Sequence, residues 1–261
     1  MYRSRDPGIE RIQARKGRLA SGMGLGILLL DDEYPGFPGD VRNPSAYPFP
    51  IQFEVVQGVD IHKLVVEADK SACLEPVRRA ALNLEKLGCR AVAGECGYFA
   101  YFQREVAASL RIPAFMSSLL QAPLAQQLIG PGRVVGILMA NANYLTPRHL
   151  ESCGIMPGTN YVVGDAMSDL QCEEFDHLWT QGLRPDPPAA SYSKAEREFL
   201  AAGVRFFQQH PHMGAMVLEC TGFPPFARAL QREIDIPIFS WGTLLEYAYS
   251  VVVHRDYYGH V

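Results

Sequence analysis

The sequence lacks the features that mark membrane, secreted and nucleic-acid-binding proteins. Its 261 residues contain no run of the roughly 18 uncharged apolar residues that a transmembrane helix needs, and the basic first 20 residues lack the apolar segment of a signal peptide. The formal charge is −4, so no excess of Lys and Arg marks a surface for nucleic acid or anionic lipid. We therefore expect a cytoplasmic protein that acts on a small molecule and binds neither nucleic acid nor membrane.

Cysteine is sparse, and its spacing is unlike that of metal sites or disulfide frameworks. The chain has 6 cysteines, with no CxxC pair and no Cys/His cluster at zinc-ligand spacing. The glycines within residues 22–26 precede an apolar strand, whereas the glycines of a dinucleotide-binding loop follow one. We therefore expect no metal and no organic cofactor. The cysteines interpreted as ordinary reduced thiols are Cys73, Cys89, Cys153 and Cys172.

A repeated segment organises the rest of the chain. Residues 91–120 and 215–244 align without a gap and share a Glu-Cys pair, two phenylalanines and an Ile-Pro-x-Phe sequence. In each copy an apolar run of strand length leads into a cysteine, Cys96 or Cys220, and a helical pattern follows. The sequence therefore predicts two related halves, each with a cysteine between a strand and a helix.

Strands alternate with helices along both halves, which is typical of parallel sheets. We predict an α/β protein with two pseudo-symmetric domains, each a parallel sheet flanked by helices, and an active site in the cleft between them. Residues 1–20 are expected to form an N-terminal arm, residues 21–120 the first domain and residues 121–240 the second. A C-terminal helix within residues 241–261 is expected to join the first domain.

The position of the two cysteines suits acid–base chemistry. Where a strand ends and a helix starts, unpaired backbone N–H groups can hold a carboxylate and lower the pKa of a thiol. Inverting a carbon next to a carboxylate requires a base on one face and an acid on the other. Two halves that face each other across a cleft would present Cys96 and Cys220 in these roles. The pattern therefore indicates proton transfer at the α-carbon of a small carboxylate.

In the segments AGECGYFAYFQ and VLECTGFPPFA, the sequence resembles the aspartate/glutamate/hydantoin racemase superfamily of cofactor-independent, two-cysteine racemases. The resemblance runs from about residue 25 to residue 244. It implies two α/β domains and a racemase that inverts the α-carbon of an amino acid, a related carboxylate or a hydantoin. It also implies that Cys96 and Cys220 are the catalytic bases and that Thr221 helps to hold the substrate carboxylate. Gly97-Tyr98 and Thr221-Gly222 depart from the motifs of amino-acid racemases, which leaves the substrate open.

The candidate substrate-binding residues are neighbours of the cysteines and polar residues that follow strands: Asp31, Gly97, Tyr98, Asn141, Thr221 and Gly222. For Asp31 and Asn141 the alternative is a structural role as a turn or cap residue. Glu95 and Glu219 are also repeated, but we interpret both as structural residues that pair with Arg or Lys behind the site, because side chains alternate between the two faces of a strand.

Other functions remain open on the sequence. A decarboxylase or a cis-trans isomerase of the same superfamily would use the cysteines differently, and a non-catalytic small-molecule-binding protein would keep only the cleft. The presence of both cysteines argues against the one-cysteine decarboxylase pattern. The sequence identifies neither the substrate nor the pathway, and it leaves open whether the chain forms a homo-oligomer.

Overall fold

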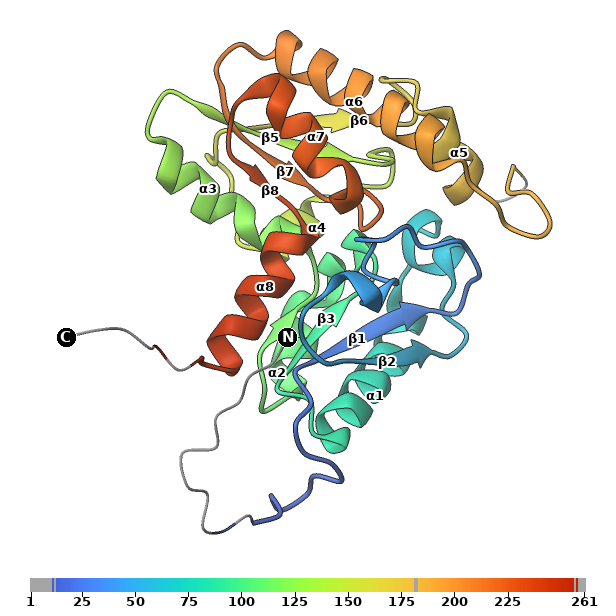
Figure 1. Cartoon of the computed structure of the whole chain (residues 1–261), viewed down its shortest axis with the longest axis vertical. Coiled ribbons are helices and arrows are strands. Elements are labelled where there is room, and N and C mark those ends of the chain that lie inside the picture. Colours follow the sequence, from blue (N-terminus) through green and yellow to red (C-terminus); the bar gives the residue numbers. More distant parts are fainter. Residues whose placement is uncertain (1–10, 12, 181–182, 256, 258–261) are drawn as a thin grey trace.

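Two four-stranded parallel sheets, each flanked by helices, form the lower and upper lobes of the molecule (Figure 1). The computed structural model describes residues 11, 13–180, 183–255 and 257, so most of the predicted arm at residues 1–20 lies outside the described residues. The strand order is β2-β1-β3-β4 in one sheet and β6-β5-β7-β8 in the other, which is the same arrangement twice. The predicted α/β fold with two pseudo-symmetric parallel sheets is confirmed.

The first lobe carries the following strands and helices: β1 (Leu25–Leu30), β2 (Ile51–Val56), β3 (Ala91–Gly94), β4 (Ala114–Phe115), α1 (Ser71–Leu87) and α2 (Gln103–Ser109). Short helical turns complete it: η1 (Pro44–Ala46), η2 (His62–Val66), η3 (Gly97–Phe102) and η4 (Ser118–Gln121). β1 is central, since Ile27 pairs with Phe53 on one side and Ala93 on the other. α1 ends at Gly88, whose φ of 102° lies in the left-handed region that glycine adopts readily.

The second lobe repeats this plan with four strands: β5 (Val134–Met139), β6 (Tyr161–Asp165), β7 (Met213–Leu218) and β8 (Ile238–Phe239). The helices of this half of the chain are α3 (Ala122–Ile129), α4 (Pro147–Ser152), α5 (Glu173–Trp179), α6 (Tyr192–Gln209) and α7 (Pro224–Ile234). Every residue of β7 is buried, as expected for a central strand covered on both faces.

The last helix, α8 (Trp241–Val252), returns from the second sheet to the first. Its buried Trp241 and Leu245 belong to the same apolar cluster as Leu25 and Ile27 of β1. The indole Nε1–H of Trp241 donates to the backbone oxygen of Glu219 at 2.6 Å. α8 therefore connects the end of β7 with the core of the first lobe.

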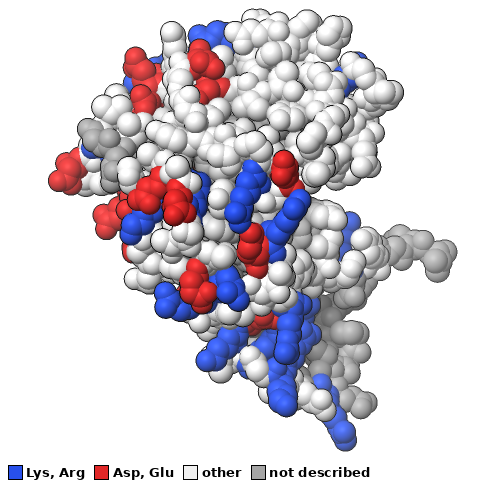
Figure 2. Space-filling view, turned by 180° about the vertical axis from the view of Figure 1, so that it is seen from behind, with Lys and Arg blue, Asp and Glu red and all other residues white. Residues whose placement is uncertain are grey.

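Surface charge is unevenly distributed on the face shown in Figure 2. Lys and Arg side chains gather at the end of the molecule that carries the first sheet, and the second lobe shows few charges on this face (Figure 2). None of the described helices is both long and apolar enough to span a bilayer.

Candidate active site

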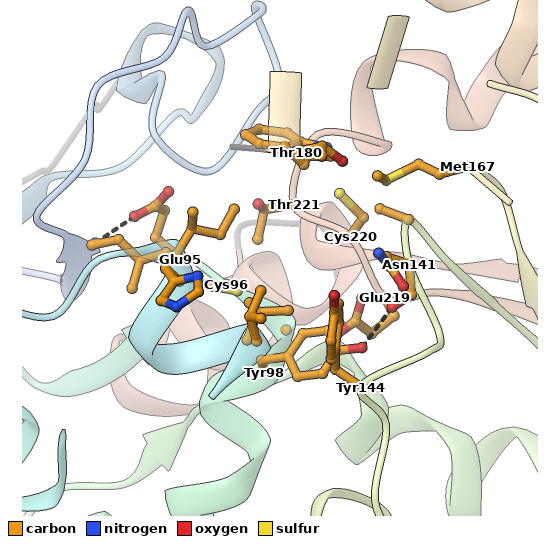
Figure 3. Close-up of a pocket in the computed structure, with 18 of the residues that line it drawn as sticks. Glu95, Cys96, Tyr98, Asn141, Tyr144, Met167, Thr180, Glu219, Cys220 and Thr221 are labelled. Carbon is orange, nitrogen blue, oxygen red and sulfur yellow. Dashed lines mark hydrogen bonds between the residues drawn. The ribbon is translucent and has the colours of Figure 1, made fainter. Parts of the chain in front are cut away.

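A cavity of about 330 Å³ lies where the carboxyl ends of the two sheets meet. Cys96, which follows β3, and Cys220, which follows β7, both line it (Figure 3). Its aromatic wall consists of Tyr34, Tyr98, Tyr144 and Trp179. Among the described residues that line the cavity there are two glutamates, Glu95 and Glu219, but no Lys or Arg. The strand edges therefore bring the two repeated cysteines into one partly open cavity that also holds two carboxyl groups.

Most of the predicted substrate-binding residues also line this cavity, namely Gly97, Tyr98, Asn141 and Thr221. Tyr98 is oriented by a 2.5 Å hydrogen bond from its hydroxyl to the backbone oxygen of Asn141, so residues of the two lobes meet on the cavity wall (Figure 3). The side-chain oxygen of Asn141 accepts from the Asn143 N–H at 3.0 Å, which leaves its amide nitrogen free of that bond. Their roles in binding substrate stay predictions.

Asp31 and Gly222 do not line the cavity, and their predicted positions are corrected. Asp31 is exposed, and its Oδ2 accepts from the backbone N–H of Gly58 at 2.8 Å, so this carboxylate holds the turn after β2. Gly222 follows Thr221, and a Cβ at this position would stand 3.2 Å from Phe175 and 3.3 Å from Trp179. Its contribution is its backbone N–H, which hydrogen-bonds to the Cys220 sulfur.

The surroundings of the two thiols differ. Burial raises the pKa of both Cys96 and Cys220 well above the usual value for cysteine, and Glu219 raises each further when it is ionised. The Tyr98 N–H and the positive charge of Lys70 lower the pKa of Cys96, and the charge of Glu95 raises it. The Gly222 N–H lowers the pKa of Cys220, and the charge of Asp40 raises it. Among the described residues, a cation therefore acts on Cys96 but not on Cys220.

Lys70 is a buried ammonium group close enough to act on Cys96. Its Nζ donates to the backbone oxygens of Val65 at 3.1 Å and Glu67 at 2.6 Å. Burial lowers its pKa, while the nearby Cys73 and Cys96 thiols oppose that effect. The residue precedes α1 and lies far from Cys96 in the chain, so no local pattern in the sequence identified it.

Glu95 lies on the cavity wall rather than behind the site, which corrects its predicted position, but it is paired with an arginine, Arg42, as predicted for a structural residue. Its Oε2 accepts from the Leu30 N–H at 2.7 Å and from Arg42 at 3.0 Å, and its Oε1 accepts from the Tyr34 hydroxyl. Burial raises its pKa, and these three donors together with the charge of Arg42 lower it. Glu95 therefore anchors the proline-rich loop at residues 31–50 over the first sheet.

Glu219, the counterpart of Glu95 in the repeat, also lines the cavity and corrects the same prediction. Its side chain is 3% exposed, and its Oε1 is buried without a hydrogen-bond partner among the described residues. Burial alone raises its pKa to about 8. A Cβ at Gly97 would overlap the Glu219 carboxyl group, so the glycine leaves room for this side chain. The prediction from side-chain alternation was wrong because Glu95 and Glu219 each lie one residue beyond the end of their strand, where the alternation of the strand no longer applies.

The loop at residues 31–50 supplies functional residues that the sequence reasoning missed. Tyr34 stands edge-on to Trp179 at 4.5 Å between ring centroids, and the Arg42 guanidinium lies 4.0 Å from the centroid of the Tyr34 ring. Asp32 pairs with Arg184 of the second lobe. The length and proline content of the loop, directly after a strand, were the available signal. The residues that the loop contacts could not be predicted from the sequence, because they lie far away in the chain.

In the part of the chain that the structure describes, no three His, Cys, Asp or Glu side chains are grouped so that they could hold a metal ion. Independence from metal and cofactor stays a prediction.

We expect Glu219→Gln to stabilise the protein at alkaline pH. The folded-state pKa of about 8 exceeds the ordinary 4.5, so the folded protein keeps a proton that the unfolded chain has lost between these values. Stability should then fall as pH rises through this window, by up to about 5 kcal/mol at ~1.36 kcal/mol per pKa unit. Urea unfolding of both proteins at pH 5 and pH 9 measures the difference. If Glu219→Gln gained the same free energy of unfolding at both pH values, the conclusion that Glu219 is protonated in the folded protein would be contradicted.

Solved structures define the class to which this fold belongs. A glycine-to-cysteine mutant of arylmalonate decarboxylase matches with a TM-score of 0.56 at 14% identity, over 88% of this chain and 92% of the other. An aspartate racemase homologue from Pyrococcus horikoshii matches with a TM-score of 0.51 at 14% identity, over 89% and 99%. A putative Asp/Glu racemase from Yersinia pestis matches with a TM-score of 0.52 at 12% identity, over 88% and 97%. The chain therefore has the fold of the aspartate/glutamate racemase superfamily.

No family model matches the chain. Its relatives in sequence are named as lyases rather than as racemases. A dimethylsulfoniopropionate lyase from Durusdinium sp. clade D is 26% identical over 230 residues, which are 82% of this chain and 70% of the relative. Dimethylsulfoniopropionate lyases 5 and 6 from Emiliania huxleyi are 25% and 28% identical, over 90% and 82% of this chain. This chain spans only 46% and 56% of the length of those two relatives.

Proposed function

We propose that the chain is a carbon–sulfur lyase that removes the α-proton of a small sulfonium carboxylate such as dimethylsulfoniopropionate. The observation that carries the proposal is the pair of cysteines in a cavity lined by aromatic rings and carboxyl groups, with no Lys or Arg among its described residues. The names of the relatives supply the substrate. The two-sheet fold supports proton transfer next to a carboxylate, since its named representatives include racemases and a decarboxylase.

The cavity suits a cationic group. The rings of Tyr98, Tyr144 and Trp179 line it and can attract a positive charge through their quadrupoles. A sulfonium bound there would place a cation in a cavity whose described lining holds no Lys or Arg. Because a nearby positive charge favours a thiolate, the bound substrate would lower the raised pKa of Cys96. The substrate thereby activates its own base.

The reaction proceeds by elimination. The Cys96 thiolate takes the α-proton, the electrons of that C–H bond form the Cα=Cβ double bond, and the Cβ–S bond breaks with its electron pair on sulfur. The products are acrylate, neutral dimethyl sulfide and a protonated Cys96, which returns its proton to solvent. Thr221 and the amide nitrogen of Asn141 can donate hydrogen bonds to the substrate carboxylate from the cavity wall.

Racemisation of an amino acid, a related carboxylate or a hydantoin is the second candidate. The matched cysteines of the repeat support it, because inversion needs one acid–base group on each face of the carbon. Both reactions begin with removal of the α-proton, and they differ in whether the β-carbon carries a leaving group. Elimination and decarboxylation are lyase reactions, so the first candidate departs from the isomerase class that the sequence favoured.

The test offers both kinds of substrate to the purified chain. With dimethylsulfoniopropionate we expect equal amounts of dimethyl sulfide in the headspace and acrylate in solution, and loss of both after the thiols are alkylated. With amino acids and hydantoins we expect no loss of optical rotation. Racemisation without dimethyl sulfide would favour the second candidate and reject the first.

A further inference from the structure

We propose that Glu219 is a third catalytic residue, a neutral carboxylic acid that donates a hydrogen bond to the substrate carboxylate while the α-proton is removed. The inference rests on the function proposed above and identifies the group that stabilises the negative charge that develops on the substrate carboxylate. It is carried by the position of a buried, unpartnered carboxyl group on the wall of the cavity that holds both cysteines.

The backbone of Glu219 is firmly held while its carboxyl group is not. The Glu219 N–H donates to Leu138 at 2.9 Å, and its backbone oxygen accepts from Trp241 at 2.6 Å. Ser118, from the first half of the chain, donates to the adjacent backbone oxygen of Leu218 at 2.7 Å. The side chain therefore starts from a fixed point between the lobes and ends beside Gly97, against the cavity.

The counterpart of Glu219 in the repeat shows what a structural carboxylate looks like in this protein. Glu95 is bound by the Leu30 N–H, the Tyr34 hydroxyl and Arg42. Glu219 has none of these donors, and its buried Oε1 stays unsatisfied. Buried polar groups are nearly always hydrogen-bonded, and the exceptions need a reason. A ligand carboxylate in the cavity would provide the missing partner.

The surroundings of Glu219 keep its proton in place at neutral pH. The titratable groups that sense its charge are Cys96, Tyr98, Cys153 and Cys220, and each of them is itself neutral when protonated. Burial raises the pKa of Glu219 to about 8, with no cation acting against it. A neutral carboxylic acid can approach the carboxylate of a substrate and donate to it, whereas a charged Glu219 would repel it.

The donated hydrogen bond matters most after proton removal. Loss of the α-proton moves a second negative charge onto the carboxylate oxygens of the substrate, and a fixed donor at that point is stronger in the transition state than in the ground state. The proton stays on Glu219 throughout, so the group is unchanged when acrylate leaves. A buried acid that is kept neutral for hydrogen-bond donation has precedent in other enzymes that form enolates.

The kinetic test compares Glu219→Gln with Glu219→Met in the full chain, with dimethylsulfoniopropionate as substrate and Glu233→Gln, on the exposed face of α7, as the control. Gln keeps a neutral donor, so kcat should stay within about tenfold, whereas Met removes the donor and should lower kcat about 10²–10³-fold. Wild-type activity should fall above pH 8 as Glu219 loses its proton, and Glu219→Gln should lose this alkaline decline. Equal loss in both variants, or an unchanged decline in Glu219→Gln, would overturn the inference.

A second measurement needs no turnover. Infrared difference spectra across pH 6–9.5 should contain the C=O band of a protonated carboxylic acid that disappears near pH 8 and is missing in Glu219→Gln. Release of dimethyl sulfide by a protein without this band would overturn the inference alone. The band in a protein that releases no dimethyl sulfide would overturn both the proposed function and the catalytic role of Glu219.

Discussion

Replacing Cys96 with alanine is expected to lower kcat/KM for release of dimethyl sulfide by about 10³-fold, the middle of the range for loss of a general base. Cys96 is the expected base because both the Tyr98 N–H and the positive charge of Lys70 lower its pKa, whereas the Gly222 N–H is the one group among the described residues that lowers that of Cys220. Cys220→Ala should cost about tenfold or less, since elimination requires only one base. Headspace gas chromatography over a range of substrate concentrations measures both.

The asymmetry between these variants separates the two candidate functions. A two-base racemase would lose inversion almost completely in either variant, because each face of the α-carbon needs its own group. Cys89→Ala is the matched control, since Cys89 is a buried free thiol outside the cavity. Comparable 10³-fold losses in Cys96→Ala and Cys220→Ala would contradict the assignment of Cys96 as the single base.

Replacing Arg42 with methionine is expected to cost about 3–5 kcal/mol of folding free energy, which is typical of breaking a buried ion pair. Arg42 donates to Glu95 at 3.0 Å and to the Leu30 backbone oxygen at 3.2 Å, and its guanidinium stacks on Tyr34. Its removal leaves the 1% exposed Glu95 side chain without its cation. Urea unfolding monitored by tryptophan fluorescence measures the loss.

The pH dependence of this loss follows from Glu95. Arg42 lowers the pKa of Glu95, so the variant raises that pKa further above the value in the unfolded chain. A raised carboxyl pKa in the folded state makes stability fall as pH rises, and the loss should therefore be larger at pH 8 than at pH 5. The double variant Arg42→Met/Glu95→Gln, which buries no charge, should recover most of the stability. No recovery would mean that Arg42 acts through packing on Tyr34 instead.

The sequence by itself determined the repeated unit and its consequences. The strand, cysteine and helix of each copy depend on contacts between near neighbours, and side-chain period and apolar runs report such contacts directly. Parallel strands place their carboxyl ends along one edge, which is why Cys96 and Cys220 could be expected in a common cavity. The end of α1 at Gly88 is local in the same way, because few other residues adopt its left-handed backbone conformation.

Only the tertiary structure decided what surrounds the two thiols. Glu95 and Glu219 occupy equivalent places in the repeat, yet Glu95 meets Arg42 and Tyr34 from the loop at residues 31–50, and Glu219 meets the bare backbone of Gly97. These partners lie tens of residues apart, and the charge state of a buried carboxyl group depends on them more than on its neighbours in the chain. Two identical Glu-Cys pairs therefore acquired different chemistry because folding surrounded them with different donors.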